Sequence, residues 1–314
     1  IHIVHTPPTA SLPRRAARVA EAIAATARDD GGPLHLIGHS SGGLDARLFT
    51  APEVALSTSV DVERLAARVR SVVTIATPHH GTPLASFFTT LRGQQLLQLL
   101  SLLTIYMLHF GHLPLAALLW MGSRFVRLGD LVVNSELLEE LFGRLLEDFT
   151  AARRRSVRAM LRDVVHDQSL MLQLTPEAME VFNASVLPRP GVRYGAVVAQ
   201  AARPGLRSTI AVGIDPAAQV THAIYGALYQ LAAATPRQLS PRLAPEAARA
   251  LRHAYGATPS AAANDGIVPT RSQAWGHVVH AAVADHLDVL GHFRDASHDP
   301  PHVDWLVTGS GFDR

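Results

Sequence analysis

Short apolar runs alternate with longer segments of helical spacing through the first part of the chain. Residues 1–5 alternate like a short strand and lead into a turn-like Pro-Pro pair. Two mostly apolar runs, 34–37 and 72–76, have the length and composition of buried strands. Alanine-rich residues 13–28 and residues 44–49 lie between these runs and have helical patterns. Strands that alternate with helices in this way favour a mostly parallel sheet flanked by helices.

The last third of the chain returns to the same pattern. Residues 192–199 and 277–282 have the character of short strands that rejoin the sheet. The alanine-rich stretch 216–262 between them is expected to be helical or loop-like. No repeat of fixed period interrupts this order. We therefore predict a single α/β domain over residues 1–314.

Residues 86–184 follow a different pattern and are predicted to be a helical cap or lid insertion within that domain. None of residues 93–123 is Asp, Glu, Lys or Arg, and the run is rich in leucine. A membrane span needs roughly 20 continuous apolar residues, but Gly111, Pro114 and two histidines divide this run. We expect a mobile or membrane-facing cap that contacts a lipid interface through 93–123. Buried helices and a membrane segment are the alternatives, and the charged residues 136–167 would complete the cap.

Composition removes several kinds of chemistry. The chain of 314 residues is 48% hydrophobic and 17% charged, which indicates a large buried core rather than disorder. It contains neither cysteine nor lysine, so thiolate metal sites, cysteine nucleophiles and Schiff-base lysines are excluded. The arginines are dispersed and the net charge is +2, so no nucleic-acid partner is predicted. Neither a signal peptide nor an initiating methionine is present at Ile1, and the localisation stays open.

The segment Gly38-His39-Ser40-Ser41-Gly42 matches the G-x-S-x-G pattern of a nucleophile elbow. Such an elbow is a sharp strand-to-helix turn that strains the serine backbone and lifts its hydroxyl above the sheet, and glycines around it avoid Cβ clashes. An apolar run precedes the pattern here and a helical segment follows it, as the elbow requires. Ser40 is the predicted nucleophile, and the backbone N–H of Ser41 is the predicted oxyanion-hole donor.

A serine hydroxyl needs a base, and the base needs an orienting acid. In folds with this elbow the chain order is serine, acid, histidine. Asp265 lies in a turn at Asn264-Asp265-Gly266, and His286 follows the strand predicted at 277–282. We predict Asp265 as the acid and His286 as the base, because Asp285 and Asp288 are too close in sequence to reach the imidazole. His39 and His79 are candidates for the substrate pocket, which His80 could also line, and the rivals for the base role are His292, His298 and His302.

Four segments together resemble the bacterial triacylglycerol lipases and esterases of the α/β-hydrolase superfamily. They are Leu36-Ile37-Gly38-His39-Ser40-Ser41-Gly42-Gly43-Leu44, Thr77-Pro78-His79-His80-Gly81-Thr82, Asn264-Asp265-Gly266-Ile267-Val268 and His286-Leu287-Asp288. They occur in the family's order and span most of the chain. The resemblance implies an α/β-hydrolase fold, a Ser40–His286–Asp265 triad and a lid within 86–184.

The chain departs from that family in three places. Such lipases carry a His-Gly segment after an early strand, and residues 1–5 look like the strand after it, so an N-terminal truncation is expected. Related lipases often bind a structural calcium, and Asp288 matches one ligand position, but the upstream aspartate has no counterpart beyond Glu246. No cofactor or metal is therefore predicted. The insertion has little likeness to the family's, so no acyl-chain preference carries over.

These features predict a serine hydrolase that cleaves carboxylic esters through an acyl-enzyme. The long apolar stretch favours lipid-like acyl esters as substrates, as in a lipase or esterase. A polyester depolymerase and a thioesterase stay open, because a fold does not fix its substrate. A non-catalytic or acyl-binding relative is the alternative from another class.

Overall fold

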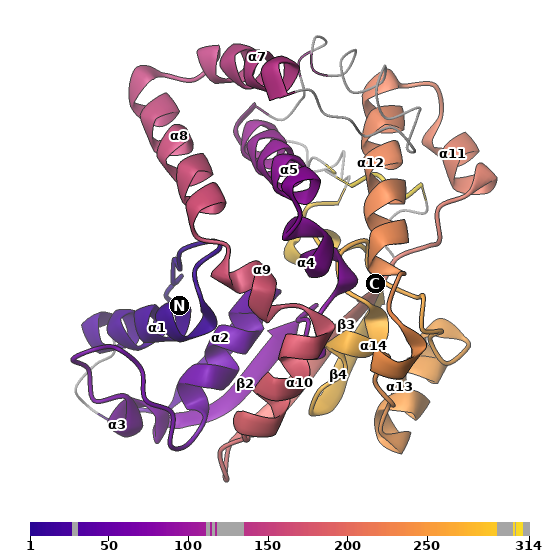
Figure 1. Ribbon diagram of the computed structural model, residues 1–314. Coiled ribbons are helices and arrows are strands. Elements are labelled where there is room, and N and C mark those ends of the chain that lie inside the picture. Colours follow the sequence, from indigo (N-terminus) through magenta and orange to yellow (C-terminus); the bar gives the residue numbers. More distant parts are fainter. Residues whose placement is uncertain are drawn as a thin grey trace.

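The computed structural model describes residues 1–26, 31–110, 114, 117, 135–293, 304 and 306–309. Four strands form one sheet in the order β1-β2-β3-β4, and every neighbouring pair is parallel. The strands are β1 (Leu34–His39), β2 (Val69–Ile75), β3 (Arg193–Gln200) and β4 (His277–Val283) (Figure 1). Because all the strands run the same way, their carboxyl ends lie along one edge of the sheet. This arrangement confirms the predicted α/β fold with a parallel sheet flanked by helices.

The described α-helices precede and connect these strands along the chain. They are α1 (Leu12–Thr26), α2 (Ser41–Thr50), α3 (Val62–Ala66), α4 (Pro83–Phe88), α5 (Leu91–Phe110), α7 (Ser135–Glu147), α8 (Ala151–His166), α9 (Ser169–Gln173), α10 (Pro176–Ser185), α11 (Leu206–Val212), α12 (Pro216–Ala232), α13 (Pro245–Tyr255) and α14 (Thr270–Gln273). Several of these helices have a short polar residue as the N-cap. Thr82, Thr175 and Asp215 each accept a backbone N–H through the side chain, and a proline follows each cap at the first helical position.

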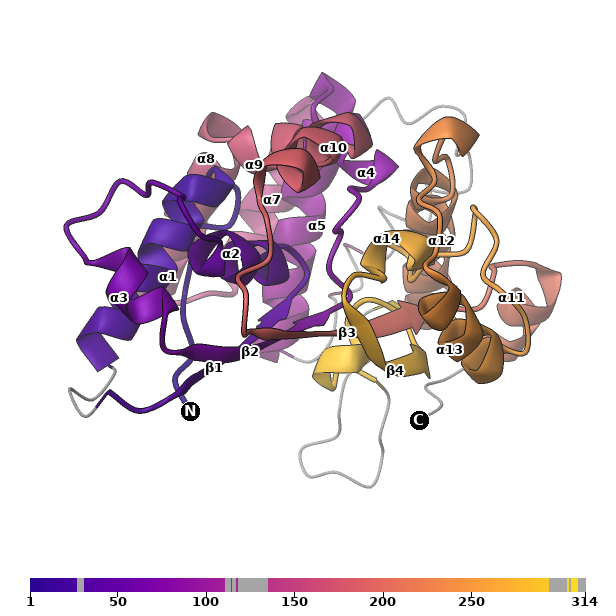
Figure 2. The same cartoon turned by 90° about the horizontal axis from the view of Figure 1, so that it is seen from below.

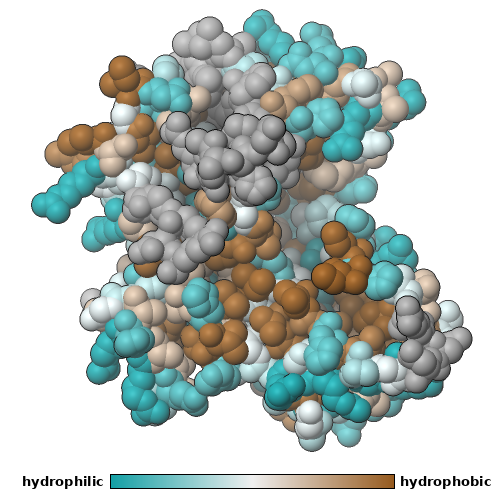
Figure 3. Space-filling view, turned by 180° about the vertical axis from the view of Figure 1, so that it is seen from behind, coloured by the Kyte–Doolittle hydropathy of each residue, from teal (hydrophilic) through white to brown (hydrophobic). Residues whose placement is uncertain are grey.

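The described helices lie over one face of the sheet, as the view from below shows (Figure 2). Leu36, Val72 and Tyr194 alternate onto that face and pack in one cluster with side chains of α1 and α2. The opposite face has no helix among the described residues. Ile37 and Val279 are exposed on it, and it forms the broad brown area in the lower half of Figure 3.

The described part of 86–184 is mainly helical and forms a second core together with α12. Leu99, Leu102 and Leu103 of α5 are almost fully buried in a cluster that also includes Leu145 of α7 and Tyr225 of α12. The apolar residues 93–110 therefore pack largely inside the protein, which corrects the expected lipid contact for this part of 93–123. Gly111 and most residues from there to 123 lie outside the described residues. No helix among those described is long and apolar enough to cross a membrane.

One expected element differs in the structure, and one expected helical stretch is divided. Residues 1–5 do not form a strand, and Ile1 and Ile3 are exposed. Alternation produces a strand only where a neighbouring strand supplies hydrogen bonds, and no described strand lies beside this segment. The charged stretch 136–167 is two helices, because Thr150 accepts the backbone N–H of Arg153 and begins α8.

Candidate active site

The chain turns sharply where β1 ends and α2 begins, and Ser40 is at the turn. Its backbone has φ 53° and ψ −132°, a conformation that few residues other than glycine adopt. Its N–H donates to the carbonyl of Ile75 on β2 at 2.9 Å, which holds the turn against the sheet. A Cβ on Gly38 would lie 2.4 Å from the carbonyl oxygen of Gly42, so the strand and helix approach closely only because residue 38 is glycine. This is the geometry that the elbow pattern predicts.

The first turn of α2 is held by a buried arginine of α1. Arg15 is 5% exposed, and its guanidinium donates to both carboxylate oxygens of Asp45, at 2.9 and 2.7 Å. The same guanidinium donates to the hydroxyl of Ser41 at 3.0 Å and to the carbonyls of Pro7 and Pro8. Ser41 is the first residue of α2, where a backbone N–H has no partner within the helix. Its N–H is therefore free of a partner within the helix, and its role as an oxyanion donor stays a prediction.

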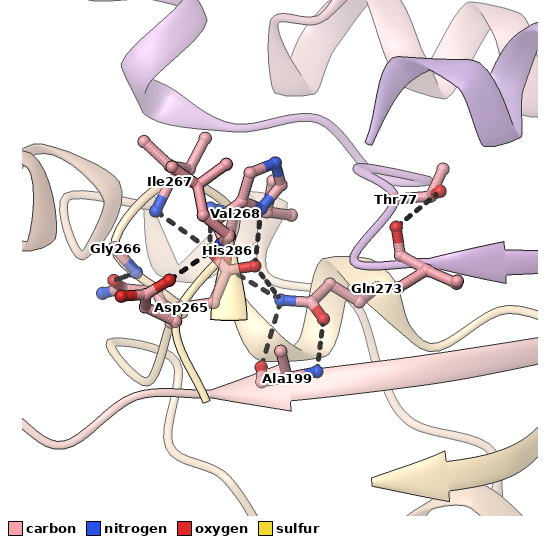
Figure 4. A network of polar contacts seen from close by, with 12 residues as sticks. Thr77, Ala199, Asp265, Gly266, Ile267, Val268, Gln273 and His286 are labelled. Carbon is pink, nitrogen blue, oxygen red and sulfur yellow. Dashed lines mark hydrogen bonds and ion pairs between the residues drawn. The ribbon is translucent and has the colours of Figure 1, made fainter. Parts of the chain in front are cut away.

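Asp265 and His286 meet beyond the carboxyl ends of β3 and β4. Nδ1 of His286 donates to Oδ2 of Asp265 at 2.8 Å, and the backbone N–H of His286 donates to the carbonyl of Asp265 at 3.0 Å. The carboxylate also accepts the backbone N–H groups of Ile267 and Val268, at 2.9 and 2.7 Å (Figure 4). Both side chains are buried. With its proton on Nδ1, the neutral imidazole has Nε2 as its basic nitrogen.

Gln273 is a site residue that the sequence did not mark. It is 1% exposed, and Nε2 donates to Oδ2 of Asp265 at 3.0 Å while Oε1 accepts the backbone N–H of Ala199 at 2.7 Å. Figure 4 shows it beneath the carboxylate, bridging α14 and β3. A glutamine in a short polar helix carries no pattern of its own, so only the fold reveals its position.

His39 packs against His286 and connects the elbow to the acid–base pair. The two ring centroids are 4.7 Å apart, and Nε2 of His39 donates to the backbone carbonyl of His286 at 2.9 Å. Burial, with a smaller contribution from His286, lowers the pKa of His39 from 6.5 to about 4. His39 is therefore neutral at ordinary pH and supports His286. The hydroxyl of Ser40 itself makes no hydrogen bond to His286 among the described residues.

His79 does not line a pocket, which corrects the prediction from the sequence. It is fully buried, Arg47 donates to Nδ1 at 3.0 Å, and Nε2 lies 3.0 Å from the hydroxyl of Thr74. The ring stacks on Trp275, whose face is also 3.8 Å from the guanidinium of Arg47. Burial lowers the pKa of His79 well below 6.5. A histidine with both ring nitrogens engaged in the core stabilises the loop after β2.

Of the other competing residues that the structure describes, His80, Asp285 and Asp288 are engaged in other contacts. Burial and then Arg47 lower the pKa of His80 to about 4, and its backbone N–H is bonded to Ser272. His298 and His302 lie outside the described residues. Asp285 and Asp288 turn away from the imidazole, because Asp285 accepts the backbone N–H groups of Leu287 and Asp288, and Asp288 accepts that of Asp285.

Three carboxylates gather beside the segment that carries His286. Asp285, Asp288 and Asp304 each offer an oxygen, and these oxygens lie within 4.8 Å of one another. Oδ2 of Asp285 is buried without a hydrogen-bond partner among the described residues. Burial raises the pKa of Asp285 well above its ordinary value. Hard oxygen donors at this spacing fit calcium. The sequence offered no upstream aspartate as a partner for Asp288, and in the structure the second partner, Asp304, lies downstream of it.

The chain has similarity to known proteins only at the level of solved structures. No protein-family profile and no curated protein sequence matches the chain. Among solved structures, the chain is similar to a metagenomic carboxyl esterase, with 20% identity and a TM-score of 0.47 over 92% of this chain and 55% of that one. It is also similar to EstA from Clostridium botulinum, with 16% identity and a TM-score of 0.46 over 99% and 78% of the two chains. Lipase 1 from Pelosinus fermentans gives 13% identity and a TM-score of 0.45 over 90% and 80%.

The chain thus spans little more than half the length of the metagenomic esterase. Similarity at this level does not assign chemistry, which has to be argued from the side chains of this chain.

Proposed function

We propose that the protein is a serine hydrolase that cleaves carboxylic esters, with Ser40 as nucleophile, His286 as base and Asp265 as orienting acid. The observation that carries the proposal is the strained turn at Ser40, where the ring of the preceding residue His39 lies 4.7 Å from that of His286, which is bonded to the buried carboxylate of Asp265 at 2.8 Å. Strain of this kind costs roughly 1–3 kcal/mol and is retained where it serves a site.

In the proposed reaction, Nε2 of His286 takes the hydroxyl proton of Ser40 as its oxygen bonds to the ester carbonyl carbon. Asp265 keeps the imidazole in the required tautomer and stabilises its cation. The N–H of Ser41 donates to the oxyanion of the tetrahedral intermediate. His286 then protonates the leaving alcohol, and water activated by the same ring releases the acid from Ser40. Hydrogen bonds between nucleophile and base often form only when substrate is bound, so the proposal does not require a Ser40–His286 hydrogen bond in the free protein.

A calcium ion would be held by Asp285, Asp288 and Asp304, where it would neutralise the carboxylates and fix the segment that presents His286. Its role would be structural, and none of the chemical steps above passes through it.

The first test compares two adjacent serines. Ser40→Ala should lower kcat for p-nitrophenyl butyrate by roughly four or more orders of magnitude, because the nucleophile is gone. Ser41→Ala is the matched control, since it retains the backbone N–H and should keep most of the activity. Hydrolysis by Ser40→Ala at the parent's rate would exclude this nucleophile.

The alternative is a non-catalytic acyl-binding protein, which the absence of a Ser40–His286 hydrogen bond favours. A fluorophosphonate probe separates the two functions. Labelling at Ser40, lost in His286→Ala, supports the hydrolase, whereas an unlabelled parent protein supports the binding function.

Substrate class within the esters is a further part of the proposal. Lipid-like acyl esters are favoured by the apolar cluster of α5, α7 and α12 that adjoins the loop of Ile267 and Leu287. A series of nitrophenyl esters of increasing chain length tests this, together with triglyceride emulsions, a polyester film and an acyl thioester. Turnover restricted to short acyl chains would contradict the lipid-like assignment.

A further inference from the structure

Helix α11 carries its apolar side chains outward and its polar side chains inward. Leu206 and Ile210 lie one turn apart and are 78% and 69% exposed, and Ile214, just past the helix, is 99% exposed. Ser208, on the opposite side of the helix, is half-buried. Amphipathic helices on a protein surface normally face the other way, because burial of aliphatic side chains is what holds them. Brown side chains project at the upper left edge of Figure 3, where α11 lies in that view.

Polar contacts hold α11 in this orientation. The hydroxyl of Ser208 lies 3.1 Å from Nε2 of His222 on α12, and Nδ1 of the same ring donates to the carbonyl of Val307 at 2.7 Å. The side chain of Gln219 donates to the carbonyl of Thr209 at 3.2 Å and to that of Gly213. The helix is therefore fixed through its polar side, and its aliphatic side chains are free to contact something outside the chain.

Two exposed arginines accompany the aliphatic side chains. Arg203 precedes α11 and Arg207 lies within its first turn. The one acidic residue of 203–216 is Asp215, whose carboxylate is engaged in capping α12 through the N–H of Ala217. The segment therefore presents aliphatic groups with a net positive charge beside them. This combination is typical of helices that lie in the interface of an anionic lipid surface.

The same segment follows the carboxyl end of β3. Ser40 follows β1, and the segment of His286 follows β4, so all three lie at the same edge of the parallel sheet. A lipid surface that meets α11 would thus meet the protein at the edge that carries the candidate site.

We propose that Leu206, Ile210 and Ile214, with Arg203 and Arg207, form an interfacial anchor that inserts into an anionic lipid surface. A second copy of the chain is a poorer occupant. Three aliphatic side chains expose on the order of a few hundred Å², whereas a stable protein interface takes about 800 Å² from each partner. The anchor does not depend on the ester hydrolysis proposed above, because it is defined by exposure and charge alone.

Vesicle co-sedimentation tests the anchor, with Ser40→Ala protein as the background so that hydrolysis cannot alter the lipid. Vesicles contain equal parts of phosphatidylcholine and phosphatidylglycerol. The triple change Leu206→Ser, Ile210→Ser and Ile214→Ser should lower the partition coefficient at least tenfold, since a buried aliphatic side chain is worth about that factor or more. Val181→Ser on α10 is the matched control, because Val181 is 69% exposed like Ile210. It should bind as the background does.

A second variant, Arg203→Glu with Arg207→Glu, tests the contribution of the positive charges in the same vesicle experiment. Binding to the anionic vesicles should fall about fivefold or more for each arginine, because each basic residue near such a surface contributes about that factor. Binding to pure phosphatidylcholine should change little. Arg64→Glu on α3, remote from α11 in Figure 1, controls for net charge and should have little effect.

Three outcomes would overturn the proposal. The first is that the Ser40→Ala background protein does not bind the anionic vesicles. The second is that the triple variant binds them as tightly as the background protein. The third is a dimer in solution that the triple variant dissociates, which would make α11 an interface between copies. The altered side chains are exposed, so the variants should keep the parent's unfolding midpoint, and this is measured alongside.

Discussion

The backbone of Ser40 stores strain that its neighbours must hold in place. Its positive φ is shared with Ala76, which ends β2 beside it. The N–H of Ser40 is bonded to Ile75, and that of Ala76 is bonded to Val197 on β3. Gly43 also has to be small, because a Cβ there would lie 2.1 Å from the hydroxyl of Thr77. The turn therefore depends on close packing as much as on the sequence of the elbow.

Two glycines of the elbow should respond differently to the same substitution. Gly38→Ala places a Cβ 2.4 Å from the carbonyl of Gly42, so either the strand or the helix has to move. We expect a loss of at least about 2 kcal/mol in the free energy of unfolding, together with lost esterase activity. Gly42→Ala is the control, because nothing lies within 4 Å of its Cβ. Urea unfolding of both variants measures this, and equal midpoints would contradict the close approach.

The sequence indicated candidate residues whose contacts come from neighbours in the chain. It did not indicate the contacts of residues whose partners are distant in the chain. Ser40 belongs to a contiguous pattern, and Asp265 lies in a turn that bonds to its own N–H groups at Ile267 and Val268. His79 was wrongly assigned to the pocket because its surroundings come from Arg47 and Trp275, which are distant in the chain. Chain position gives no hint of such contacts.

At the scale of elements, Arg15 connects three segments through one guanidinium. It is bonded to Asp45 of α2, to Ser41 at the start of α2 and to the carbonyls of Pro7 and Pro8. A buried ion pair contributes little over an apolar replacement of both partners, but removal of one partner leaves an uncompensated charge. The orientation of α2, and with it the N–H of Ser41, depends on both partners.

Arg15→Met should destabilise the protein by about 3–5 kcal/mol, because Asp45 is then a buried carboxylate without its partner. Burial already raises the pKa of Asp45 despite the opposing effect of Arg15. Arg18→Met on the same helix is the control: its pair with Glu21 is exposed, and the change should stay within about 0.5 kcal/mol. The double variant Arg15→Met with Asp45→Leu should recover much of the loss. Similar unfolding midpoints for Arg15→Met and Arg18→Met would refute the structural role of this pair.

Periodicity predicted the elements that have partners in the sheet or over it. The patterns at 13–28 and 34–37 correspond to α1, whose bounds are Leu12–Thr26, and to β1, which continues to His39. Residues 1–5 have equally good alternation but no described strand to pair with. Strand pairing is a long-range property, so alternation alone could not separate these two segments.

At the scale of the molecule, packing explains residues 93–110, the part of the uncharged stretch that the structure describes almost continuously. Leu99, Leu102 and Leu103 are buried against α7 and α12, which begin far downstream in the sequence. A run without charges fits both a lipid-facing lid and a buried helix, and only the packing partners decide between them. The lipid contact that composition suggested for 93–123 is not supported for its described part, 93–110, and a different lipid contact is proposed for α11.

The carboxylate cluster is also a property of the whole molecule, because Asp304 joins Asp285 and Asp288 from near the end of the chain. Two buried carboxylates and one half-buried carboxylate repel one another, and burial raises the pKa of Asp288 to about 6. A bound calcium ion would make each carboxylate stabilising instead of repelling. Loss of one carboxylate should therefore raise or leave unchanged the free energy of unfolding without calcium, and lower it with calcium.

With a chelator present, Asp288→Asn should leave the unfolding midpoint unchanged or raise it, because one repelling charge is removed. With calcium at a hundredfold excess over its Kd, the parent should gain about 2.7 kcal/mol, and the variant should lose most of this gain. Asp61→Asn at the start of α3 is the control, since asparagine also caps a helix and the residue is remote from the cluster. Thermal unfolding of the three proteins, each with calcium and with chelator, measures the crossover. If calcium does not change the unfolding midpoint of the parent, or changes that of Asp288→Asn equally, these carboxylates do not bind the ion. Proton sharing would then reduce their repulsion.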